Sequence, residues 1–160
     1  AREARCQGTL TVSDFEIFVP GVPASQGSKR GFAFKRKGGS LGVSMTESSK
    51  KLKPWRASVS YVASQKWKRD PHPKGVELVL LFQFSRPKSH MGTGRNSEKI
   101  KQSSPTSHTK YPDVDKLARG VMDALSGIIY KDDSQVCSLK VEKRYDQSPG
   151  VFIFATFRRH

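Results

Sequence analysis

The 160-residue sequence is poor in the features that mark secreted, disulfide-bonded or membrane proteins. Its two cysteines, Cys6 and Cys137, are too few for a disulfide framework, which indicates a reducing cytoplasm. No hydrophobic run approaches the length of a membrane span, and the first residues form no hydrophobic signal segment. The four histidines are scattered without metal-ligand spacing, and we expect them in loops or at the surface. These absences argue against a zinc site and against a membrane partner.

Carboxylates are scarce as well, with 14 acidic residues against 29 lysines and arginines, so the formal net charge is +15. The first 110 residues hold 21 basic and 7 acidic side chains, whereas the last 50 hold 8 and 7. So basic a surface favours nucleic acid as a partner. A chain of this length forms one domain with a substantial core. We place that domain at residues 14–160, after a flexible tail at residues 1–13.

The few acidic residues gather in one stretch. Five of the 14 lie within the 21 residues from 113 to 133, and they are Asp113, Asp115, Asp123, Asp132 and Asp133. A carboxylate cluster in a basic protein suits a metal-dependent enzyme that acts on a polyanion, because the surface attracts phosphates and the carboxylates hold a divalent cation. The alternative is that the acids belong to a solvated helix face and a turn. Composition alone does not separate these two interpretations.

Apolar spacing indicates how the acids are arranged. Apolar residues recur every three or four positions and predict a helix over residues 114–126, with Asp113 as its N-cap and a glycine directly after it. Such a helix rises roughly 17 Å. The apolar run that follows, residues 128–130, could return alongside it at about 3.3 Å per residue. We therefore expect Asp133 to come back beside Asp113 and Asp115, so that three carboxylates meet at one end of the helix.

The order of motifs in this region resembles one known family. Residues 111–145 read YPDVDKLARGVMDALSGIIYKDDSQVCSLKVEKRY and are similar to the RusA family of Holliday junction resolvases, found largely in phages and prophages. That family carries Asp-x-Asp at the start of a helix, then Asp-Ala-Leu, then Asp-Asp-x-Gln, then a strand that ends in Lys-Arg-Tyr. All four elements occur here in that order, and the basic segment SRPKSHMGTGRN before them also resembles phage members.

The resemblance implies a structure-specific endodeoxyribonuclease that resolves four-way DNA junctions by paired nicks, acting as a homodimer in the cytoplasm of a bacterial host. It implies that Asp113, Asp115 and Asp133 hold Mg²⁺, for which Mn²⁺ can substitute. An oxygen-only ligand set suits either ion. The role of Asp132 stays open between an outer ligand, a general base and a turn residue.

The catalytic lysine of the family falls on Arg119 in this chain, which departs from the family pattern. An arginine keeps the positive charge but does not readily release a proton, so we expect Arg119 to stabilise charge on the phosphate. Lys116, in the same motif, could supply the missing amine. A simpler alternative is that Arg119 only pairs with Asp115 across one helical turn.

Two basic segments are candidates for gripping DNA. Residues 29–37 precede a Gly-Gly pair and predict a basic loop or a hairpin, whose phenylalanines either stack on an exposed base or pack inward. Residues 86–110 predict a long polar loop just before the acidic stretch, and a loop of that length is usually functional or disordered. The predicted DNA-binding residues are Lys29, Arg30, Lys35, Arg36, Lys88, Arg95, Lys99, Lys101 and Lys116.

The remaining patterns predict an α+β fold. Alternating apolar residues predict strands near residues 15–19, 76–84, 137–145 and 151–157, and residues 50–69 predict a second helix. We expect a mixed or mostly antiparallel sheet with two main helices packed on it. Two other functions stay open: a non-catalytic basic module that binds DNA or RNA, and a nuclease that prefers other branched DNA.

Overall fold

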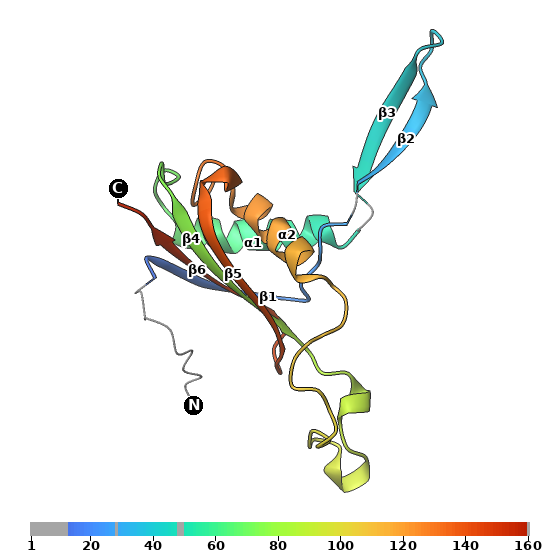
Figure 1. The fold of residues 1–160 in the computed structure, drawn as a ribbon, viewed down its shortest axis with the longest axis vertical. Helices are drawn as coiled ribbons and strands as arrows, with labels where there is room; N and C mark the ends of the chain where they lie inside the picture. Colours follow the sequence, from blue (N-terminus) through green and yellow to red (C-terminus); the bar gives the residue numbers. More distant parts are fainter. Residues whose placement is uncertain (1–12, 28, 48–49, 160) are drawn as a thin grey trace.

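The computed structural model describes residues 13–27, 29–47 and 50–159 (Figure 1). The predicted tail, residues 1–13, lies outside these ranges except for its last residue. The strands are β1 (Phe15–Pro20), β2 (Lys29–Lys35), β3 (Leu41–Glu47), β4 (Val76–Phe84), β5 (Val136–Tyr145) and β6 (Gly150–Phe157). The helices are α1 (Leu52–Lys66) and α2 (Val114–Leu125), with 3₁₀ turns η1 (Lys88–His90), η2 (Gly94–Asn96) and η3 (Asp133–Gln135).

Four strands form one mixed sheet in the order β1-β6-β4-β5. β4 and β5 run parallel, and the other neighbours run antiparallel. β4 is internal, as its nearly continuous apolar run indicates. Among the described residues, β2 and β3 pair only with each other, as a separate hairpin. The expected single α+β domain, with a mixed sheet and two main helices, is confirmed.

Both helices pack on the same face of the four-stranded sheet. Because side chains alternate between the two faces of a strand, every second residue of each central strand points into this layer. The shared core includes Ile17, Val19, Leu80 and Ile153 from the strands and Val59, Leu117 and Val121 from the helices. The apolar stripe predicted for α2 is thus buried, and its charged side turns to solvent. None of the described helices is long and apolar enough to cross a lipid bilayer.

The chain returns along α2 through β5, and not through residues 128–130 as expected. Gly127 has a φ of 78°, and its amide donates to the carbonyl of Tyr130 at 2.7 Å, so the chain closes a turn there. β5 then runs back beneath α2 until Nζ of Lys143 reaches the carbonyl of Pro112, just before the helix, at 2.7 Å. The residues that precede β5 are therefore left beside the C-terminal half of α2.

Two arms extend from the body at opposite ends of the long axis of the molecule (Figure 1). One is the hairpin, strands β2 and β3 with their connection, which turns at Gly38 and Gly39 as expected. The other is residues 86–110, called the lobe below, which the sequence predicted as a structureless loop. It contains η1, η2 and a bridge between Met91 and Ile100 instead. The lobe is therefore an ordered arm.

Aromatic and imidazole rings hold the lobe against the end of the sheet. His108 stacks on Phe84 with ring centroids 4.3 Å apart, and the guanidinium of Arg86 lies 4.8 Å from the ring centroid of Tyr145. His90 meets Tyr145 edge-on and is only 8% exposed. His90 thus lies in the predicted loop segment, residues 86–110, but it is buried and not at the surface, and its pKa is lowered by burial and by nearby cations.

Candidate active site

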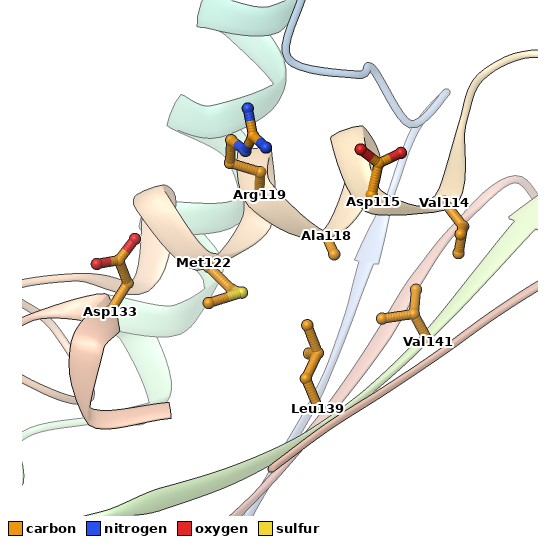
Figure 2. A pocket seen from close by; sticks show the side chains of 8 residues that line it. All are labelled: Val114, Asp115, Ala118, Arg119, Met122, Asp133, Leu139 and Val141. Carbon is orange, nitrogen blue, oxygen red and sulfur yellow. The ribbon is translucent and has the colours of Figure 1, made fainter. Parts of the chain in front are cut away.

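A shallow cleft of about 280 Å³ opens between the exposed side of α2 and β5 (Figure 2). Its walls are mostly apolar, and charged side chains stand along its rim. The residues that line it are Val114, Asp115, Ala118, Arg119, Met122, Asp133, Leu139 and Val141. Three of the four residues predicted to be catalytic, namely Asp115, Arg119 and Asp133, therefore open onto one cleft.

Helix geometry orders these three side chains along the cleft. Asp115 stands in the first turn of α2, and Arg119 follows one turn later on the same side. Asp133 comes from η3 and lies near Met122, at the far end of the cleft from Asp115 (Figure 2). Within the described part of the chain, Asp115 and Arg119 form no ion pair. The simpler alternative for Arg119, a pair across one helical turn, is therefore not seen.

Asp113 occupies the N-cap position of α2, as expected, but its side chain caps no backbone amide. Its Oδ2 atom instead accepts a hydrogen bond from Nζ of Lys116 at 2.7 Å. This bond and the charge of Lys116 lower the pKa of Asp113, and the same pairing raises the pKa of Lys116. Lys116 is therefore a paired ammonium group, which is ill suited to releasing a proton while it holds Asp113.

Carboxylate oxygens are suitable ligands for a hard divalent cation, but the three predicted carboxylates do not gather around one point. Within the described residues, no group of three or more His, Cys, Asp or Glu side chains could hold one ion. The expected meeting of Asp113, Asp115 and Asp133 at one helix end is thus not seen in the single chain, because β5 is the segment that retraces the helix. Mg²⁺, however, is commonly held by one or two carboxylates, and water and substrate phosphates complete its shell. The cleft offers two carboxylates, those of Asp115 and Asp133.

The Asp-Asp-x-Gln motif forms a turn that presents Asp133 to the cleft. Asp132 caps η3, because its Oδ1 atom accepts from the amide of Ser134 at 2.9 Å, and bonds from Ser134 lower the pKa of Asp132. Gln135 completes the turn by accepting from the amide of Asp132 at 3.0 Å. Its Nε2 atom donates to two carbonyls in the segment before β4, at 2.9 and 2.8 Å. Of the three roles left open for Asp132, the structure supports that of a turn residue.

Lys143 is a residue that the sequence argument missed. It lies on the side of β5 that faces α2, and its Nζ atom donates to the carbonyls of Lys110 and Pro112 at 2.8 and 2.7 Å. These bonds hold the segment that leads into Asp113, and the charge of Lys143 adds to that of Lys116 in lowering the pKa of Asp113. The available signal was a lysine at an inward-facing position of a strand whose other inward residues are mostly apolar.

The predicted DNA-binding residues lie on both arms and at the site. They are Lys35 and Arg36 at the tip of the hairpin, Lys88, Arg95, Lys99 and Lys101 on the lobe, and Lys116 on α2. The side chains of Lys29 and Arg30 in β2 lie outside the described part of the structure. Nζ of Lys101 also donates to the carbonyl of Ser89 at 3.0 Å, so this residue contributes to the lobe itself.

Substitution of Gln135 tests how Asp133 is positioned. Gln135→Ala removes the side-chain bonds that close η3 and tie it to the segment before β4, so we expect the free energy of unfolding to fall by about 1–3 kcal/mol. Gln135→Glu should be at least as costly, because it keeps the acceptor but turns a carboxylate oxygen toward two carbonyls. Gln65→Ala, at an exposed position of α1, is the control. Unchanged urea denaturation curves for both Gln135 variants would contradict this positioning role.

Known sequences match this chain over most of its length. A family model, described as Endodeoxyribonuclease RusA, matches residues 20–155. The chain is also 37% identical over 133 residues to the uncharacterized protein YqaN of Bacillus subtilis (strain 168), and the match covers 83% of this chain and 89% of that protein. The family match includes α2, η3 and β5, the elements that build the cleft. The chain therefore belongs to the RusA family of endodeoxyribonucleases.

Proposed function

We propose that this protein is a divalent-metal-dependent endodeoxyribonuclease that resolves Holliday junctions by paired nicks. Members of the RusA family are Holliday junction resolvases that act on branched DNA. One observation carries the proposal to this chain: Asp115, Arg119 and Asp133 line a single open cleft in a protein of net charge +15. Two carboxylates with a guanidinium between them, on a basic surface, suit a phosphodiester as substrate.

The carboxylates are assigned to the metal. Asp115 and Asp133 are the residues that would hold Mg²⁺, or Mn²⁺ in its place, and Asp113 would join them from the N-cap. Such an ion, when bound, polarises a phosphoryl oxygen and lowers the pKa of a bound water. Apart from Arg119, the residues that line the cleft between these two carboxylates are apolar.

We assign different roles to the two basic residues, Arg119 and Lys116. Arg119 stands between the carboxylates and would meet the negative charge that develops on the phosphate. Its guanidinium can donate two parallel hydrogen bonds to phosphate oxygens. Lys116 already holds Asp113 ionised through a 2.7 Å hydrogen bond. We therefore assign the charge role of the family lysine to Arg119 and a holding role to Lys116.

Paired nicks require two copies of the cleft, and we propose that a homodimer supplies one from each subunit. The basic residues of the hairpin and the lobe would bind phosphates of the DNA arms on either side of the cleft. Origin from a phage or prophage, and action in the cytoplasm of a bacterial host, belong to the same proposal.

The direct test is incubation with a labelled four-way junction, with and without Mg²⁺. We expect metal-dependent paired nicks from the natural sequence, and a loss of about 100-fold or more in Asp115→Asn and in Asp133→Asn, with junction binding intact. Glu16→Gln removes an exposed carboxylate from β1, at the opposite edge of the sheet from β5, and should cleave normally.

Other outcomes would select the other functions. A protein that binds junctions but never cuts them with Mg²⁺ or Mn²⁺ is a non-catalytic module. Faster cutting of flaps than of four-way junctions identifies a nuclease of another specificity. Near-normal turnover by Asp133→Asn would remove Asp133 from the site.

Three further variants separate the roles of Arg119 and Lys116. Arg119→Ala should lower the single-turnover rate at saturating Mg²⁺ by about 100-fold or more, whereas Arg119→Lys should keep most of it. Lys116→Met frees Asp113 and should lower the Mg²⁺ concentration that gives half the maximal rate. A Mg²⁺ titration of each variant distinguishes these effects. If Lys116→Met instead loses as much maximal rate as Arg119→Ala, the assignment of Arg119 is wrong and the lysine acts on the phosphate.

A further inference from the structure

The hairpin stands away from the helices and the four-stranded sheet, and the residues at its tip are exposed (Figure 1). Its strands pair with each other from Lys29↔Glu47 to Lys35↔Leu41, and neither joins the main sheet. A two-stranded hairpin of this kind is at best marginally stable on its own. Segments of low local stability are the ones that proteins use to close on ligands and partners.

Several apolar side chains at the tip are exposed in the described part of the structure. The exposed fraction is 46% for Phe34, 74% for Leu41 and 68% for Val43. Leu41 and Val43 lie two residues apart on β3 and share one face of the hairpin, whereas Phe34 pairs with Gly42 and points to the other face. Single exposed apolar residues are ordinary, but three of them on one projecting tip mark an interaction site.

Phe34 is held in a position suited to stacking. A Cβ atom at Gly42, its cross-strand partner, would lie 2.7 Å from Cζ of the ring, so the ring lies over the backbone of β3 in the space that a side chain at position 42 would occupy. Gly42 is buried as a result, while the ring keeps an open side. An aromatic ring that already rests on the backbone of its own hairpin loses less conformational freedom than a free side chain when a flat partner lies against it.

The charge at the tip selects the kind of partner. Lys35, Arg36 and Lys37 follow Phe34 directly, all three are exposed, and residues 30–46 contain no acidic residue. A second copy of the same tip would be repelled, whereas the backbone of a nucleic acid would be attracted. Apolar side chains beside cations and without carboxylates fit bases that are flanked by phosphates.

We propose that the hairpin tip enters the branch point of a DNA junction. There Phe34 stacks on the open face of a terminal base pair, and the cations of the tip bind the flanking phosphates. Stems end at a branch point, so their last base pairs offer apolar faces that a continuous duplex hides within its stack. Proteins that kink DNA insert apolar side chains between base steps in a similar way. This inference rests on the proposed function only in that the DNA it binds is branched.

The test measures binding in EDTA, where no cleavage occurs, to a four-way junction with 2-aminopurine beside the branch point and to a linear duplex of equal length. The natural sequence should prefer the junction and change the 2-aminopurine fluorescence, because this base reports on its stacking neighbours. Phe34→Ala should abolish the change and lower the preference for the junction about tenfold. Phe34→Trp should retain both. Tyr61→Ser, which removes another exposed aromatic side chain, is the control.

A charge variant separates stacking from phosphate binding. Replacement of Lys35, Arg36 and Lys37 by glutamine should weaken binding to junction and duplex alike. It should also reduce the slope of log K against log salt by about 0.9 for each phosphate that the tip no longer binds. Phe34→Ala should leave that slope unchanged. Because these side chains are exposed, every variant should unfold at the temperature of the natural sequence.

An unchanged junction preference together with an unchanged fluorescence response in Phe34→Ala would overturn the proposal. So would a Phe34→Ala protein that loses a dimer in sedimentation experiments while its DNA preference stays the same, because the tip would then contact a second copy. Failure of the proposed function looks different: binding and fluorescence would be as expected, but Mg²⁺ would produce no cleavage.

Discussion

Burial of the apolar stripe of α2 against the sheet determines where the charged groups of the site stand. Leu117 and Val121 are completely buried, and the helical repeat then turns Asp115 and Arg119 outward above β5. Burying one such side chain stabilises the fold by about 1.5–3 kcal/mol, whereas an exposed ion pair contributes about 0–1 kcal/mol. Packing of the apolar side chains of α2 therefore determines where its charged side chains stand in the cleft.

Residues near the two ends of strand β5 position the acidic groups of the site. At its start, Gln135 ties η3 to the segment before β4 and leaves Asp133 facing the cleft. Near its end, Lys143 holds the carbonyls of the segment that leads into Asp113. Asp133 at one end of the cleft and Asp113 at the start of α2 thus depend on the same strand. A change in the register of β5 would move both of them.

The sequence was sufficient where the signal is local. The period of the apolar residues predicted a helix over residues 114–126, and α2 spans Val114–Leu125. The strands and the fold class followed from the same kind of pattern. The grouping of Asp115 with Arg119 needed only the helical repeat. These features were predicted correctly because tertiary packing agrees with the local conformational preference of the chain.

Long-range features were harder to predict. Residues 128–130 are apolar enough for a strand, but they form a turn in which Tyr130 is buried and donates its hydroxyl to the carbonyl of Met122. A buried turn and a buried strand can have the same apolar composition, so the sequence did not distinguish them. Residues 128–130 were therefore expected to return along α2, where the structure has β5. The ordered lobe was missed for a related reason: its sequence is polar, and the contact between buried His90 and Tyr145 joins residues that are far apart in the chain.

We propose that the cleft beside α2 binds divalent metal at Asp115 and at Asp133, on either side of Arg119. Titration of Mn²⁺ into ¹⁵N-labelled protein, followed by two-dimensional NMR, tests this claim most directly, because a paramagnetic ion broadens only the amide signals near it. We predict that amides around Asp115 and Asp133 broaden first, at substoichiometric Mn²⁺, while those of β1 stay sharp. Broadening centred on another part of the chain, or spread evenly over all the carboxylates, would contradict the account.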